Sequence, residues 1–326
     1  MNKFVRVAQT SQSLSLAAME EASRLGLREA DIDHLFLALV ISDQSAGRAL
    51  RSMGIDLVAA RRAVEEQHDA QLASLGIETS FPEAGRIVFH ETDGYEWTRR
   101  ARDLIAESSA KNKAGDAAAV LRELLAEPSG LIADILARLG ATPDDVLEHL
   151  DSPAAKAAPA TSKSARRLSG TSETFVPAPM DEVWELLADP ARIPEWEPSI
   201  GSIDNTGQDP APGMVWVGHT PRIRPDGKPV KAKPRFRRRS IEFVSADRPD
   251  GVAWSFGYPD VRGSNPVLTE LTLRDTPGGT QVQITRSWSR RRGWRGMVAL
   301  PLRPLQKFIV WISLFQIGSA ISRAFR

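Results

Sequence analysis

Apolar residues in the first half of the chain recur at steps of three and four. Leu14, Ala18, Ala22 and Leu25 follow this spacing and Gly26 comes directly after them, which predicts an amphipathic helix ended by a glycine. Asp31 is placed to cap a second helix, which is nearly all apolar at residues 35–39 and should therefore be mostly buried. The same spacing predicts two more helices, at residues 46–53 and 57–64.

The same order of helices then returns. Residues 101–114 correspond to the first helix, and AAAVLRELLAEPSGLIADILARLGATPDDVLEHL corresponds to DHLFLALVISDQSAGRALRSMGIDLVAARRAVEE. Gly54 and Gly140 end the third helix of each copy. A four-helix unit of this size cannot bury its apolar face alone, so we expect the two copies to pack as one all-α domain.

After residue 170 the period changes to two. Alternating apolar and polar residues predict seven strands, with a helix and a short second helix after the first strand and a long helix at about 294–323. Gly278 and Gly279 should form a tight turn before the last strand. This order predicts an antiparallel sheet curled around a long C-terminal helix. The predicted strands are residues 172–176, 200–205, 214–219, 238–244, 252–258, 267–275 and 280–288.

The segment between the two patterns reads SPAAKAAPATSKSARRLSG and has neither a period nor an apolar core. Small residues, proline and scattered cations are typical of a flexible linker. We therefore predict an all-α domain at residues 1–151, a linker at 152–169 and an α+β domain at 170–326.

Charge supports this division. The net charge of the chain is +1, but residues 1–151 hold 16 Lys and Arg against 25 Asp and Glu, and residues 152–326 hold 26 against 16. The overall content of 42% hydrophobic and 25% charged residues is typical of a globular protein. The chain has no cysteine, which excludes thiol catalysis and fits a reducing compartment. The N-terminus lacks the apolar run of a signal peptide, and the apolar stretch at 308–321 is too short to span a bilayer. We expect a cytoplasmic protein.

The doubled pattern, DHLFLAL…GRALRSMGID and AVLRELLAEPSG…ILARLGAT, resembles the N-terminal Clp repeat domain of bacterial Clp unfoldases. This resemblance covers about residues 1–150 and implies binding of substrates, adaptors or Clp protease components. In some members an acidic residue at the start of the second helix binds phosphorylated arginine. Its position here is Asp33, beside His34, whereas the second copy has Ala118 and Ala119. A structural role is the alternative for both residues: Asp33 as an acid in the first helical turn, and His34 as a hydrogen-bonded histidine.

No ATPase accompanies this module. The phosphate-binding motif G-x-x-x-x-G-K-[ST] occurs nowhere in the 326 residues, and the Gly227–Lys228 pair is followed by proline. The chain is therefore expected to bind what Clp machines bind, or to bind the machines, without unfolding anything.

The second domain begins with VPAPMDEVWELLADPARIPEWEPSI, which resembles the SRPBCC superfamily with its START-like helix-grip fold. That superfamily includes polyketide cyclases and lipid carriers, so the resemblance implies a pocket for a hydrophobic small molecule between sheet and C-terminal helix. It implies no catalytic motif. The residues that we expect in the pocket are Trp184, Trp254, Phe256, Arg286, Trp288, Trp311 and Phe315.

Arg286 stands out because it falls on the apolar face of the last strand with Val282, Ile284 and Trp288. A buried arginine needs a partner, which a ligand carboxylate, phosphate or polarised carbonyl would supply. The alternatives are that this face has left the core at that point or that Glu270 pairs with Arg286.

Other candidate chemistry has simpler interpretations. Asp189, Glu195 and Glu197 flank a tryptophan and suggest an acid–base pair, but carboxylates on a short helix and turn are usually solvated. The five histidines show no metal-ligand spacing, and no cofactor is expected. The basic runs 235–239 and 290–292 are interpreted as solvated strand ends, without a nucleic-acid motif.

Together these features favour a non-enzymatic role: an adaptor, decoy or sensor that binds a protein partner through the first domain and a hydrophobic ligand through the second. The alternative is an enzyme resembling a polyketide cyclase or dehydratase, with the first domain as a tether. A third is weak contact with a membrane surface through the basic face and the last helix.

Overall fold

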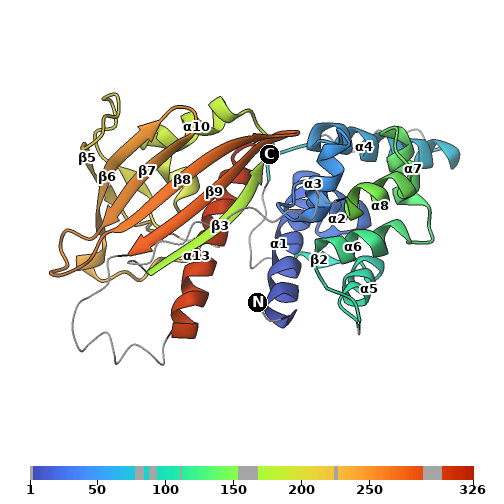
Figure 1. The fold of residues 1–326 in the computed structure, drawn as a ribbon, viewed down its shortest axis with the longest axis horizontal. Helices are drawn as coiled ribbons and strands as arrows, with labels where there is room; N and C mark the ends of the chain where they lie inside the picture. Colours follow the sequence, from blue (N-terminus) through green and yellow to red (C-terminus); the bar gives the residue numbers. More distant parts are fainter. Residues whose placement is uncertain are drawn as a thin grey trace. The chain divides into compact units, whose positions relative to one another are not determined.

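The computed structural model describes residues 3–77, 84–87, 94–110, 112–152, 168–223, 227–288 and 303–326. The chain divides into two compact units, residues 1–158 and 159–326. One is helical and the other is built on a sheet (Figure 1). Most of the predicted linker, and the second basic run at 290–292, lie outside the described residues.

The helical unit shows two successive sets of four helices (Figure 1). A short parallel pair, β1 (Glu29–Ala30) and β2 (Glu96–Trp97), precedes α2 and α5. The first set is α1 (Lys3–Arg24), α2 (Ile32–Val40), α3 (Ser45–Ser52) and α4 (Leu57–Ser74). The second set is α5 (Arg99–Ser108), α6 (Ala117–Leu125), α7 (Leu131–Arg138) and α8 (Pro143–Asp151).

Local sequence accounts for the limits of these helices. The side chains of Asp31, Asp56 and Asp116 accept backbone N–H groups at the starts of α2, α4 and α6. Gly54 and Gly140 follow α3 and α7 with φ of 81° and 72°, a left-handed conformation that glycine adopts without strain. The helix predicted at 57–64 is longer than expected, because α4 continues to Ser74.

The two sets pack against each other through their third and fourth helices. Helix α3 contacts α8, and α4 contacts α7, so the last two helices of each set lie on those of the other. Helix α2 is buried along its whole length, as its apolar composition predicts. Each set thus supplies the surface that the other needs to bury its apolar face.

The second unit is a seven-stranded antiparallel sheet in the order β3-β9-β8-β7-β6-β5-β4. All seven predicted strands are present, and Gly278–Gly279 lies at the turn between β8 and β9. The strands are β3 (Leu168–Val176), β4 (Ser202–Ile203), β5 (Val215–His219), β6 (Arg238–Asp247), β7 (Gly251–Gly257), β8 (Val267–Thr276) and β9 (Gly279–Trp288). The helices are α10 (Met180–Ala188), η1 (Pro190–Arg192), α11 (Ile193–Trp196), η2 (Pro234–Phe236) and α13 (Arg303–Arg323).

Helix α13 lies close against β3 and β9, which are neighbours in the sheet (Figure 1). A Cβ atom on Gly170 of β3 would come within 2.3 Å of Val310 Cγ1, so glycine is what permits this approach. The arrangement fits a helix-grip fold, as predicted, although residues 294–302 at the start of the predicted last helix lie outside the described residues. In the parts of the chain that are described, no helix is both long and apolar enough to cross a bilayer.

Candidate functional site

A group of polar side chains lies buried on the inner face of the sheet, where β9 ends. Arg286 is only 7% exposed and is held by three different elements. Its Nε donates to Thr269 Oγ1 of β8 at 3.1 Å, its Nη2 to Glu197 Oε2 at 2.6 Å, and its Nη1 to the hydroxyl of Ser313 on α13. All three nitrogens of Arg286 therefore have a partner within the protein.

The carboxylate beside Arg286 is not that of Glu270, the residue named as an alternative from the sequence. Glu270 is exposed and lies on the opposite face, because the register pairs Arg286 with Thr269. Glu197 is only 1% exposed, so its interpretation as a solvated carboxylate is wrong. The chain brings it in directly after α11, whose Trp196 is fully buried.

A second arginine, Arg239 on β6, is also buried, with 5% of its surface exposed. The prediction of a solvated strand end is therefore wrong for this residue, although Arg235, Arg237 and Arg238 are exposed. Its Nη1 donates to the Tyr258 hydroxyl at 2.9 Å, and its guanidinium lies 4.2 Å from the centre of that ring. Its Nε has no hydrogen-bond partner among the described residues.

The electrostatics of Arg239 follow from this position. Burial lowers its pKa, and the charge of Arg286 lowers it further, while Tyr258 and Glu197 oppose the shift. The two arginines and Glu197 thus form one group of interacting buried charges on the inner face of the sheet.

Two of the predicted pocket residues are part of the closed core. Trp254 is fully buried and donates its Nε1 to the carbonyl of Leu187 at 2.8 Å, and Phe256 is 1% exposed. Their rings lie against those of Phe243, at 4.6 Å from Trp254, and Trp196, at 6.2 Å from Phe256. Both side chains belong to the hydrophobic core of this unit, and their role in lining a ligand pocket stays a prediction.

The remaining predicted aromatic residues lie at two ends of the sheet. Trp288, Trp311 and Phe315 are half-buried, and the last two are stacked with ring centres 5.8 Å apart. Trp184 instead donates to the carbonyl of Gly251, a residue of β7 that lies opposite Thr272 of β8. Trp288 of β9 lies opposite Val267 of β8. These two positions on β8 are separated by roughly 17 Å along the strand. Trp184 is therefore not brought together with the other three.

In the helical unit, Asp33 is buried in α2 with 3% of its surface exposed. His34 Nδ1 lies 2.7 Å from one carboxylate oxygen, and His68 Nε2 of α4 lies 2.7 Å from the other. Burial acts to raise the pKa of Asp33, but its interactions with His34 and His68 outweigh it and hold that pKa well below its usual range. His68 had no signal in the sequence, because it is 35 residues away from Asp33.

This geometry bears on the prediction of partner binding by Asp33 and His34. Both side chains are buried and both oxygens of the carboxylate are engaged, which is the arrangement of the structural alternative. In the second set of helices, Asp116 caps α6 by accepting from the N–H of Ala119 at 3.1 Å. Binding by Asp33 or His34 remains a prediction.

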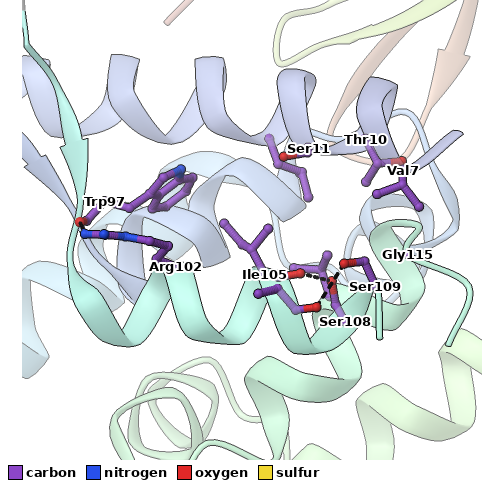
Figure 2. Close-up of a pocket in the computed structure, with 12 residues that line it drawn as sticks. Val7, Thr10, Ser11, Trp97, Arg102, Ile105, Ser108, Ser109 and Gly115 are labelled. Carbon is purple, nitrogen blue, oxygen red and sulfur yellow. Dashed lines mark hydrogen bonds between the residues drawn. The ribbon is translucent and has the colours of Figure 1, made fainter. Parts of the chain in front are cut away.

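A pocket that the sequence did not predict lies between α1 and α5 (Figure 2), with a volume of about 290 Å³. Val7, Thr10 and Leu14 of α1 face Ile105 and Ser108 of α5 across it. Both helices come first in their set of four, so the pocket lies where the two sets meet. Among the described residues, no group of three His, Asp or Glu side chains is arranged so that it could hold a metal ion.

Comparison with known proteins assigns the sheet unit. Residues 167–308 match the family described as polyketide cyclase / dehydrase and lipid transport. The second unit contains a domain of this family. The match supports an SRPBCC-like domain that binds hydrophobic small molecules. It does not extend to the helical unit, for which the resemblance to Clp repeats stays a prediction.

Several solved structures are similar to the chain. A protein from Chromobacterium violaceum is 15% identical, with 47% of this chain and 97% of that chain covered and a TM-score of 0.32. A protein from Mycobacterium smegmatis is 20% identical, with 49% and 90% covered and a TM-score of 0.32. A polyketide-cyclase-like protein from Corynebacterium glutamicum is 16% identical, with 49% and 93% covered and a TM-score of 0.34. No curated protein matches the chain.

Proposed function

We propose that the second unit binds a hydrophobic small molecule between the inner face of its sheet and α13. The family match over residues 167–308 is the observation that carries this proposal. The half-buried side chains of Trp288, Trp311 and Phe315 support it, since they offer apolar contact area that the core has not fully used.

The proposal extends to the chain as a whole: a non-ATPase adaptor, decoy or sensor whose helical unit binds a protein partner. The doubled order of helices and the absence of a phosphate-binding loop in the sequence support this part. Clp protease components, or the proteins delivered to them, are the partners that the resemblance of residues 1–150 suggests.

Native mass spectrometry of the full-length protein, purified without detergent, tests ligand binding. We expect a discrete excess mass that is lost in Trp311→Ala and Phe315→Ala but kept in Trp184→Ala. The last variant is the matched control, because Trp184 is equally half-buried but lies at the other end of the sheet. Retention of the excess mass in both α13 variants would place the ligand elsewhere.

The partner is tested by isothermal titration of the full-length protein with a purified Clp ATPase, alone and assembled with its peptidase. Saturable heat with a defined stoichiometry supports an adaptor or decoy. The absence of binding to both forms rejects the Clp part of the proposal and leaves ligand binding untouched.

A second candidate is an enzyme of the cyclase or dehydratase kind, with the helical unit as a tether. The observation that favours it is the buried carboxylate of Glu197 beside Arg286, Ser313 and Thr269, because polar groups held in an apolar interior are the usual setting of acid–base chemistry. Turnover of a bound polyketide-like compound by the wild-type protein would establish it, and loss of turnover in a Glu197→Gln variant that is still folded would assign the step to Glu197. A ligand recovered chemically unchanged from the wild-type protein would reject it.

A further inference from the structure

The buried polar group contains one more cation than anion. Arg239 and Arg286 are both at least nine-tenths buried, and the carboxylate of Glu197 lies 2.6 Å from Arg286. No carboxylate lies within ion-pair distance of Arg239 among the residues that the structure describes. The only hydrogen bond it makes there is with the hydroxyl of Tyr258.

This arrangement is unfavourable for a protein without a ligand. A guanidinium has five N–H donors and remains charged in proteins, so burying it with one neutral partner leaves both charge and donors unsatisfied. Arg239 shares the inner face of β6 with Ile241 and Phe243, which are 0% and 1% exposed. Buried charges in folded proteins normally have a partner of opposite charge.

We propose that Arg239 anchors a carboxylate group of the hydrophobic ligand. This inference rests on the proposed function, and it names the chemical class of the ligand: an amphipathic molecule with an apolar body and a single acid group. A carboxylate carries the one negative charge that the group lacks, and its two oxygens match the fork of a guanidinium. A phosphate dianion would leave a negative charge in excess.

The sequence pointed to Arg286 for this role, but the structure assigns it to Arg239. Arg286 has a partner at each of its three nitrogens, whereas Nε of Arg239 has none. The apolar body of the ligand has suitable contacts at the same end of the sheet. Val310 and Ile317 lie one helical turn before and after Ser313 on the same side of α13, and both are apolar side chains in or against the core.

Paired probes that differ only in the acid group test the inference. The full-length protein is titrated calorimetrically at neutral pH with dodecanoate and dodecanol, and with naphthoate and naphthylmethanol. The wild-type protein should bind at least one acid about tenfold or more tighter than its alcohol, as expected for charge-assisted hydrogen bonds. Arg239→Met should bind acid and alcohol alike, with the affinity for the alcohol unchanged.

Arg238→Met is the matched control. Arg238 is the preceding residue of the same strand, but its side chain is 53% exposed and its nearest carboxylate, Asp260, is 3.5 Å away. This variant removes the same charge from the other face of β6 and should keep the preference for the acid. Arg239→Lys is the second variant: it keeps the charge but loses the fork, and it should reduce the preference several-fold.

The outcomes separate the two proposals. Equal binding of acid and alcohol to the wild-type protein, or an acid preference that survives in both Arg239 variants, overturns the anchor but leaves the hydrophobic site in place. If none of the four probes binds to the wild-type protein, the proposed ligand site is rejected and the anchor with it.

Discussion

Each unit buries a charged residue, and the surroundings of the two differ. Asp33 in α2 and Arg239 in β6 are 3% and 5% exposed. Each oxygen of Asp33 faces an imidazole nitrogen at 2.7 Å, so the helical unit provides all the partners that this carboxylate needs. Arg239 has a single hydroxyl partner and a free Nε among the described residues. Burial alone therefore does not indicate a ligand site, whereas a buried charge without a partner of opposite charge requires an explanation, which a ligand can provide.

The largest effect should follow from removing the partner of Arg286. Glu197→Gln leaves two buried cations without an anion, and we expect the free energy of unfolding of the second unit to fall by about 3 to 5 kcal/mol. Tryptophan fluorescence during urea denaturation reports on this unit, since seven of the eight tryptophans lie in residues 152–326.

Glu195→Gln provides the comparison, because Glu195 lies in α11, two residues before Glu197, with 46% of its side chain exposed and a surface pair to Arg192. Glu195→Gln should lower the free energy of unfolding by less than about 1 kcal/mol. Equal effects of the two substitutions would show that the buried Glu197–Arg286 pair contributes no more to stability than an exposed ion pair does.

Asp33 should have the next largest effect. Asp33→Asn keeps the size of the side chain but loses the charge that faces His68 and the backbone N–H of His34, so we expect the helical unit to be destabilised by about 2 kcal/mol. Far-UV circular dichroism during urea denaturation measures it. Asp103→Asn is the control, because the side chain of Asp103 is 70% exposed and its ion pair with Arg99 is long, at 3.7 Å.

The same carboxylate gives the helical unit a dependence on pH. The pKa of Asp33 in the folded protein lies below its ordinary value of 3.8. Its contribution to stability is therefore complete above that value and is lost as the pH falls below about 4. Denaturation midpoints measured between neutral and acidic pH should fall less in Asp33→Asn than in the wild-type protein over this range. Parallel curves would contradict the depressed pKa.

The smallest expected effect is a gain in stability, not a loss. Arg239→Met replaces an incompletely paired buried cation by an apolar side chain of similar length, and we expect the ligand-free second unit to gain about 1 kcal/mol. The fluorescence midpoint in urea should therefore rise. A marked fall would mean that the contact of Arg239 with Tyr258 is needed for folding, as a structural cation–π pair would be.

The sequence predicted the elements better than their partners. Alternation gave all seven strands, and glycine and aspartate marked the ends of helices, because these signals act within a few residues. The pairing of Glu197 with Arg286 joins residues 89 apart, and no local pattern encodes it. The strand alternation itself argues against Glu270, because the register places Thr269 opposite Arg286 and turns Glu270 to the other face. Alternation also could not tell whether Trp254 fills the core or lines a cavity, since both require an inward side chain.

The packing of α3 and α4 against helices of the second set has a consequence for the synthesis of the chain. Helix α3 packs on α8, and α4 packs on α7, so the first set remains without its main partner until nearly all of the helical unit has left the ribosome. The nascent first set then exposes an apolar face for the whole time that residues 75–142 are being translated, and native packing cannot be completed by local contacts alone. We expect nascent chains that end before α7 to be sensitive to protease and chains that extend into the second unit to be resistant.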